Sequence, residues 1–227
     1  RSGTAGLQDG LDLLTALATH PETARRLARK LWSFFISEVQ PADGAFLDEI
    51  AALYLRSGTE MRPVVRAVLT SRWFTDPAIR FTRYASPPEF VVRAIREVGW
   101  QDLELARVVG ALANMGMRLY DPPNVGGWTS GQGWLSTATM MARSTFAAVL
   151  ASSQRGPLVT ALGAAGTSTP DGALAALRDR VTTAPLDARP LQALERYATT
   201  GDWSGERDAR VAGLVRLLVA SSEYQLV

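Results

Sequence analysis

Glu89 and Asp121 are the two carboxylates whose surroundings in this sequence could support bond-breaking chemistry. Glu89 lies in the segment SPPEF at 86–90, and Asp121 opens a glycine-rich stretch. A glycosidase needs two carboxyl groups within about 5–10 Å of each other, and the sequence does not show whether these two meet. An acid that follows two prolines at a helix start also stabilises the helix dipole without any chemistry. Two interpretations therefore stand, a catalytic pair and a helix-stabilising acid.

Histidine and cysteine chemistry is almost absent from the chain. His20 is the only histidine, and there is no cysteine. Sites built on several histidines or on cysteines, disulfides, iron–sulfur clusters and thiol nucleophiles are therefore excluded within these 227 residues. We expect no metal and no cofactor. His20 could act as an acid or base near neutral pH, but directly before Pro21 it is better suited to capping a helix.

The stretch Tyr120–Ser136 is the best candidate for a binding site. Its sequence at 121–134, DPPNVGGWTSGQGW, suits neither a helix nor a central strand. Two tryptophans could present flat faces to a sugar ring or to a partner's side chain, or they could fold inward and pin the loop onto the helices. The candidate ligand-binding residues are Asn124, Trp128, Gln132, Trp134 and, on the following helix, Arg143. For Arg143 we favour a structural role over ligand binding, in which it holds loop carbonyls or a carboxylate such as Asp121.

A second candidate is a basic surface on the helix expected over 21–36. Arg25 with Arg29 and Arg26 with Lys30 are i, i+4 pairs that stack positive charge. Such a stripe could meet an acidic polymer, an anionic surface or a partner's carboxylates, or it could be an ordinary solvated face. The net charge of the whole chain is only +2, so nucleic acid is not an expected partner.

Apolar residues recur at helical spacing along most of the chain, and no run is long enough to span a bilayer. The fold class we predict is all-α, a multi-helical antiparallel array with one long Gly/Trp-rich loop. The expected helices cover 9–19, 21–36, 43–56, 61–71, 87–98, 102–117, 136–152, 171–182, 187–199 and 205–221.

The small, polar stretch 163–170 is the best candidate for a linker. We therefore expect a main domain at 1–162 that carries the loop 120–136, and a C-terminal helical subdomain at 171–227 packed on it. The sequence contains one short internal similarity, an echo of one segment in another: LTSRWF at 69–74 resembles VASSEY at 219–224. The echo is compatible with a duplicated unit and with two helical hairpins that end alike.

Four segments together resemble the bacterial domain-of-unknown-function family 1800. They are HPETARRLARKLWSFF at 20–35, VVRAVLTSRWF at 64–74 with SPPEFVVRAIR at 86–96, PPNVGGWTSGQGWLSTATMMARSTF at 122–146, and LLVASSEYQL at 217–226. The resemblance implies the C-terminal half of a longer protein, with an N-terminal helical region that is missing or supplied by another chain. It also implies export to a periplasmic or extracellular setting. No catalytic residue is carried over, because the family's motifs identify relatives without identifying chemistry.

The sequence thus leads to one leading hypothesis and one rival. The leading hypothesis is a non-catalytic interaction module of an exported protein, which binds a partner protein or a surface polysaccharide through the Trp128/Trp134 loop. The missing N-terminal half of the same protein is a further expected partner. The rival is a hydrolase of an extracellular polymer that uses Glu89 and Asp121.

Overall fold

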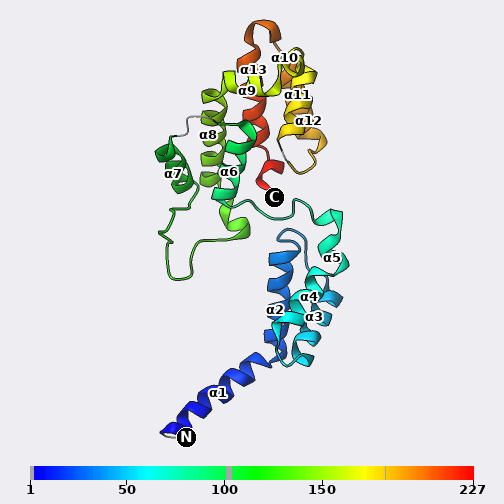
Figure 1. Ribbon diagram of the computed structural model, residues 1–227, viewed down its shortest axis with the longest axis vertical. Coiled ribbons are helices and arrows are strands. Elements are labelled where there is room, and N and C mark those ends of the chain that lie inside the picture. The colour runs from blue at the N-terminus through cyan, green and yellow to red at the C-terminus, as the bar shows by residue number, and fades with distance from the viewer. Residues whose placement is uncertain (1–2, 101–103, 182) are drawn as a thin grey trace. The chain divides into compact units, whose positions relative to one another are not determined.

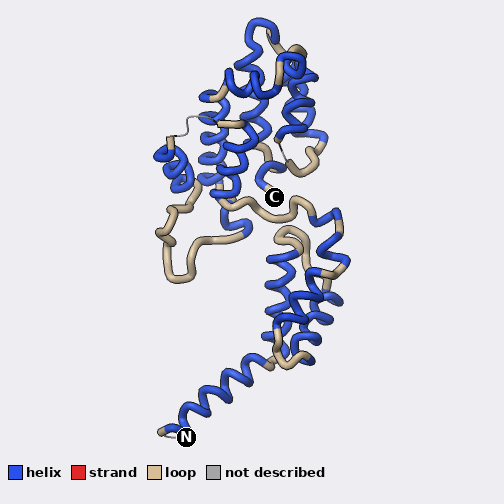
Figure 2. Tube along the Cα trace, viewed as in Figure 1, coloured by secondary structure: helices blue, strands red, loops and turns tan. Residues whose placement is uncertain are grey.

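The computed structural model confirms the all-α class. It describes residues 3–100, 104–181 and 183–227. Within these ranges the chain forms helices and turns (Figures 1 and 2), and the only β-type pairing is one isolated bridge between Tyr84 and Leu226. The chain divides into two compact units, Arg1–Arg83 and Tyr84–Val227. The boundary lies just before the SPPEF segment, so the stretch 163–170 belongs to the interior of the second unit.

Unit 1 is built on three packed helices around one apolar core. The core includes Trp32, Ile50 and Val64, which are nearly or fully buried, and the Trp32 ring contacts the Trp73 ring edge-on at 5.4 Å. The helices of unit 1 are α1 (Thr4–Ala18), α2 (Pro21–Phe35), α3 (Gly44–Arg56), α4 (Met61–Leu69), α5 (Arg72–Thr75) and the 3₁₀ turn η1 (Pro77–Ile79).

Helix α1 differs from the others in unit 1, because its leucines face solvent. Leu7, Leu14 and Leu17 keep 72%, 63% and 54% of their surface exposed. The sequence predicted a later start, near Asp9, from the apolar positions Leu11, Leu14 and Leu17. The helix begins instead at Thr4.

Unit 2 has a larger core that joins helices from both of its ends. Phe90, Leu150, Leu214 and Tyr224 are buried together in it. The helices are α6 (Pro87–Val98), α7 (Leu105–Asn114), η2 (Gly131–Trp134), α8 (Thr137–Ser153), α9 (Arg155–Leu162), α10 (Ala164–Thr167), α11 (Pro170–Arg180), α12 (Ala188–Thr199), α13 (Trp203–Val219) and η3 (Glu223–Gln225).

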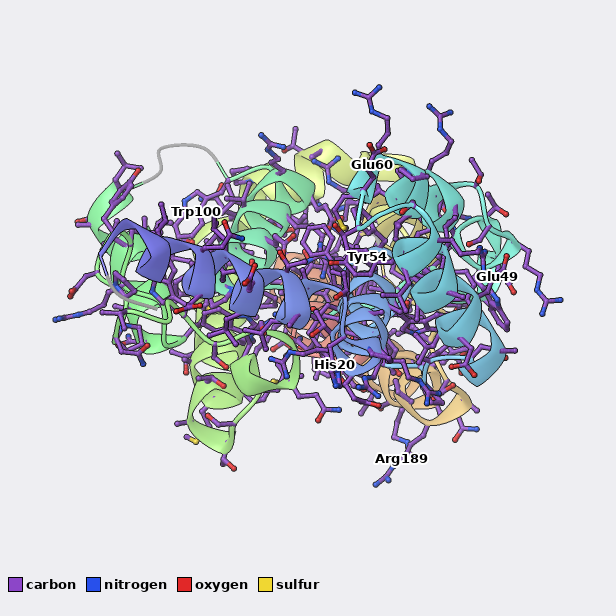
Figure 3. The ribbon with its side chains drawn as sticks, turned by 90° about the horizontal axis from the view of Figure 1, so that it is seen from below. His20, Glu49, Tyr54, Glu60, Trp100 and Arg189 are labelled. Atoms are coloured by element: carbon purple, nitrogen blue, oxygen red, sulfur yellow. The ribbon has the colours of Figure 1, made fainter. Side chains whose placement is uncertain are left out.

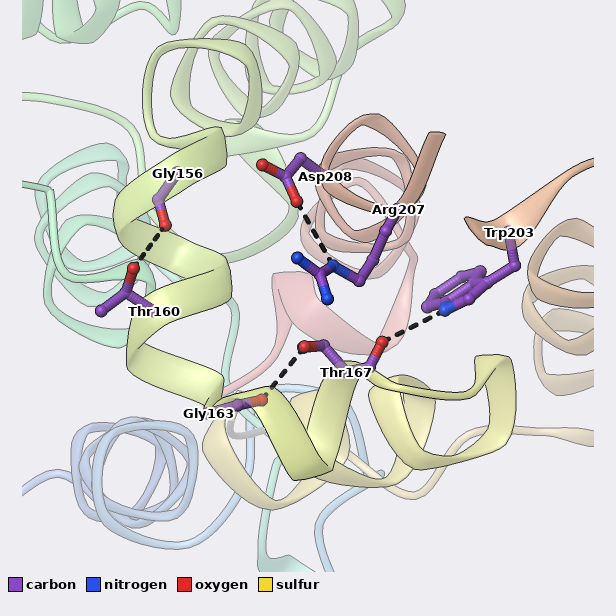
Figure 4. Close-up of polar contacts among 7 residues, drawn as sticks. All are labelled: Gly156, Thr160, Gly163, Thr167, Trp203, Arg207 and Asp208. Carbon is purple, nitrogen blue, oxygen red and sulfur yellow. Dashed lines mark hydrogen bonds and ion pairs between the residues drawn. The ribbon is translucent and has the colours of Figure 1, made fainter. Parts of the chain in front are cut away.

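The stretch 163–170 is packed into unit 2 by side-chain hydrogen bonds. Thr167 is fully buried, and its hydroxyl donates to the carbonyl of Gly163 at 3.0 Å. The indole N–H of Trp203 donates to the carbonyl of Thr167 at 3.1 Å (Figure 4). Composition alone predicted a linker here, whereas these contacts hold α10 between α9 and α11.

The two echoing segments end their helices with the same local geometry. At the end of α4, the hydroxyl of Ser71 accepts from the backbone N–H of Phe74 at 3.3 Å. At the end of α13, the hydroxyl of Ser221 accepts from the N–H of Tyr224, also at 3.3 Å. Each serine therefore satisfies a backbone donor of the short turn that follows its helix, and each turn places an aromatic ring on its unit's core.

Candidate functional site

The loop between α7 and α8, at 115–136, is anchored at its C-terminal side. Trp134 keeps only 6% of its surface exposed, and its carbonyl accepts from the hydroxyl of Thr139 at 2.8 Å. Ser136 caps α8 by accepting from the N–H of Thr139, which bonds back to the N–H of Ser136. These contacts make the loop's C-terminal side part of the folded unit, so Trp134 serves as an anchor.

The tip of the loop is shaped by one side chain and by a left-handed glycine. The carboxamide oxygen of Asn124 accepts from the N–H of Gly126 at 2.8 Å, and the carbonyl of Asn124 accepts from the N–H of Gly127 at 3.0 Å. Gly127 has φ 87°, a region that favours glycine. Asn124 is therefore engaged in turn formation, and the turn it closes presents Val125 outward.

Two large side chains of the loop project into solvent. Tyr120 is 97% exposed and Val125 is as exposed as it would be in an extended peptide. Tyr120 also has φ 64°, which is uncommon for a residue with a side chain and costs backbone energy. Figure 2 shows this segment extending past the ends of the helices that flank it.

Trp128 and Gln132 lie between the anchor and the tip. Trp128 is half-buried, and its indole N–H is shielded from solvent. Within the described part of the chain, this N–H has no hydrogen-bond acceptor. The amide of Gln132 donates to the hydroxyl of Tyr84 at 3.2 Å, which ties the loop to the first residue of unit 2.

Arg143 is fully buried in the core below the loop. Its two terminal nitrogens donate to neutral acceptors, the side-chain oxygen of Gln225 at 2.9 Å and the carbonyl of Ala85 at 2.8 Å. Its guanidinium lies over the ring of Phe90 at 4.9 Å. Burial, with the nearby charge of Arg93, lowers the pKa of Arg143 to about 10.

A second arginine, Arg93 on α6, binds the same C-terminal segment. It donates to the carbonyls of Leu226 and Tyr224, and its guanidinium lies 4.0 Å from the centre of the Tyr224 ring. The Tyr224 hydroxyl donates to Glu97 at 2.7 Å. Burial raises the pKa of Tyr224 well above its ordinary value, and the charge of Glu97 raises it further.

The two arginines therefore join three segments that are distant in the sequence. These are the SPPEFVVRAIR segment, the segment with the loop and α8, and the C-terminal LLVASSEYQL segment, all of which carry the family resemblance. Comparison with family profiles agrees, because the profile described as "Protein of unknown function (DUF1800)" matches residues 1–226. The chain belongs to this family. No curated protein and no solved structure gives a match.

In this DUF1800 chain, the two candidate catalytic carboxylates are each engaged in local structure. Glu89 closes the capping box of α6, accepting from the N–H of Ser86 at 2.9 Å and from its hydroxyl at 2.8 Å. Asp121 is exposed and ion-paired with Arg118 at 3.2 Å. Neither carboxylate lines any of the three surface grooves described in the two units.

The basic residues of α2 are all exposed, and one of them is paired. Arg25 forms an ion pair with Asp48 of α3 at 2.8 Å, while Arg26, Arg29 and Lys30 lie on the solvent side of the helix. The positive surface is therefore partly neutralised by Asp48, and its other three cations are exposed to solvent.

His20 stands at the N-terminus of α2 (Figure 3). Its Nδ1 accepts from the N–H of Glu22 at 3.2 Å, and Pro21 begins the helix. This is the capping geometry that the His-Pro sequence favoured.

Over the described ranges, histidine and acidic side chains form no group of three that could hold a metal ion. No helix in those ranges combines the length and the apolar character needed to cross a bilayer.

Sequence reasoning did not identify Arg93, Tyr224 and Gln225 as a cluster. Their hydrogen bonds connect residues more than 80 positions apart, and one sequence shows no such pairing. The available signal was that Arg143 is the only charged residue of α8 and lies in a segment that carries the resemblance; Arg93 lies among other charged residues of α6 and gave no such signal.

Proposed function

We propose that this chain is a non-catalytic interaction module that binds a partner protein through the tip of the loop 120–136. The observation that carries the proposal is the exposure of Tyr120 and Val125 on a loop whose Trp134 is buried. We place the module in an exported protein on the family resemblance alone.

Pre-organisation of the loop supports this proposal. The Asn124 turn and the buried Trp134 restrict the loop before any partner arrives. A restricted loop loses less conformational entropy on binding than a flexible one, which favours affinity. The strained backbone of Tyr120 is also more typical of functional sites than of ordinary loops.

A protein partner fits the exposed chemistry better than a polysaccharide does. Sugar rings stack on accessible aromatic faces, and the burial of Trp134 removes one of the two tryptophans expected to supply them. The tip instead presents Val125 and Tyr120, and tyrosine is enriched at protein interfaces. Polysaccharide binding is the alternative outcome of the test below.

The rival hydrolase has less support from the geometry. The carboxylate of Glu89 is held in a capping box and that of Asp121 in an ion pair with Arg118. A glycosidase would need both carboxyl groups to face one substrate cleft.

The test compares two single substitutions of exposed valines, Val125→Glu in the loop and Val92→Glu on α6, where Val92 is 45% exposed. Both add one charge at a solvent-facing valine, so both should fold as the parent does. Immobilised protein is used to capture partners from an extract of the native cell envelope. A panel of polysaccharides is assayed in parallel by tryptophan fluorescence and by released reducing ends.

Loss of a discrete captured protein with Val125→Glu and its retention with Val92→Glu is the expected result. Equal capture by both variants would refute the role of the loop. Saturable binding of a polysaccharide that Val125→Glu abolishes would replace the protein partner with a glycan. Release of reducing ends would favour the hydrolase.

A further inference from the structure

The surface of unit 2 has a groove between α8, α12 and α13 that the proposed function does not use. Its volume is about 520 Å³, within the range of about 300–1,000 Å³ typical of small-molecule sites. Its lining combines alanine and other small residues with polar, charged and aromatic side chains. The lining residues used below are Thr145, Ser152, Arg155, Tyr197, Gly213 and Arg216.

The charge of this groove is one-sided. Arg155 and Arg216 are its only charged lining residues, and no carboxylate of the described chain forms an ion pair with either. Asp208, which precedes the lining residue Ala209 in α13, is ion-paired with Arg207 at 3.5 Å (Figure 4). Two cations that share a groove repel each other, and an anion bound between them relieves that repulsion.

Tyr197 is positioned at this groove by a glycine. A Cβ atom at Gly213 would lie 1.9 Å from the Tyr197 hydroxyl, so only glycine leaves room for the phenol where it stands. The guanidinium of Arg210 lies 5.3 Å from the centre of the Tyr197 ring, and its charge also acts on the carboxylate of Asp202. The phenol thus brings a hydroxyl donor and an aromatic face to a site with a positive field.

We propose that the α8/α12/α13 groove is a binding site for a phosphate-bearing ligand. Arg155 and Arg216 would contact the phosphate oxygens, because guanidinium groups donate charge-assisted hydrogen bonds to phosphate. The ring of Tyr197 and the lining alanines would contact an apolar or aromatic body attached to the phosphate; these alanines are Ala148, Ala151, Ala209 and Ala212. The inference is independent of the loop contact, since none of the loop's residues lines this groove.

Isothermal titration calorimetry of the full chain tests the proposal with inorganic phosphate, phenyl phosphate and phenol as probes. Phenyl phosphate should bind saturably and more tightly than inorganic phosphate, while phenol should not bind. Arg155→Gln and Arg216→Gln should each weaken phenyl phosphate binding by about tenfold or more. Gly213→Ala should weaken it by displacing the Tyr197 ring.

The matched control is Arg189→Gln on α12. Arg189 is exposed, points away from the chain (Figure 3) and does not line the groove, so this variant removes the same charge and should bind as the parent does. Circular dichroism of each variant confirms that it folds.

Two results would overturn the proposal. One is the absence of saturable binding of both phosphate probes. The other is equal weakening by Arg189→Gln and by the groove variants, which would indicate a general charge effect. Vesicles with and without phosphatidic acid distinguish the source of the phosphate. Binding that needs the acidic lipid and is lost in Arg155→Gln and Arg216→Gln would identify a membrane headgroup. Binding of soluble phenyl phosphate alone would identify a free ligand.

Discussion

Replacing Arg143 by methionine measures what the buried arginine contributes to unit 2. Methionine keeps a long unbranched side chain but removes the charge and the donors. Two hydrogen bonds from a charged donor, to Gln225 and to the carbonyl of Ala85, contribute about 1.5–3 kcal/mol each. Burial opposes this gain, because lowering the pKa of Arg143 from 12.5 to about 10 corresponds to about 3 kcal/mol. These two terms leave a net gain of about 0–3 kcal/mol. The variant also leaves the buried acceptors on Gln225 and Ala85 without their donor, which costs about 1–3 kcal/mol for each group. We therefore expect Arg143→Met to lower the free energy of unfolding by at least about 1 kcal/mol.

Urea unfolding followed by circular dichroism and tryptophan fluorescence gives this free energy. The two units need not unfold together, so the two signals are compared before a single transition is fitted. Arg189→Met, at an exposed position, is the control and should change stability by less than about 0.5 kcal/mol. An Arg143→Met protein as stable as the parent, or more stable, would refute the reasoning that the hydrogen bonds outweigh the cost of burying the charge.

Three further predictions concern single contacts. Tyr224→Phe removes the hydrogen bond to Glu97. Because folding raises the pKa of Tyr224, the stabilisation from this bond is complete below about pH 10 and declines above it. The difference in melting temperature between parent and variant should therefore shrink as the pH rises through that value. Gly133→Ala should destabilise the protein by no more than about 1 kcal/mol in chemical unfolding, because its Cβ would lie 1.9 Å from the hydroxyl of Thr129 but both residues are exposed and the Thr129 side chain can rotate away. A loss of several kcal/mol would contradict this reasoning. Ser71→Ala should cost about 1 kcal/mol by removing a cap, measured as a shift of the thermal midpoint, whereas Ser71→Asp should retain most of the stability.

Local signals in the sequence were sufficient to predict most helices. Helix α2 begins at Pro21 and ends at Phe35, within one residue of the expected span, because a His-Pro start and a clear apolar stripe mark it. Gly58 ends the α3 region with φ 65°, as a glycine after a helix predicts. Helix α9, at Arg155–Leu162, was not expected, since its Gly156 and Pro157 resemble a loop. The predicted helix at 102–117 falls partly outside the described residues.

The candidate site was less predictable than the helices, because its residues are placed by contacts between distant segments. The sequence identified the loop 120–136 and offered both an outward and an inward position for its tryptophans. Burial decides for the inward position at Trp134, and this depends on the packing of helices that no local pattern specifies. Arg143 stood out as a polar residue on a mostly apolar helix, but its partners Ala85 and Gln225 lie 58 and 82 positions away.

Site-specific photo-crosslinking in the native cell tests the central claim most directly. A photoreactive amino acid is placed at Val125, at the exposed tip of the loop, and separately at Val92, an exposed position on α6. The proposed function predicts a discrete crosslinked protein from position 125 that is absent from position 92. Identical crosslinking patterns from the two positions would contradict the claim that the loop is the binding surface.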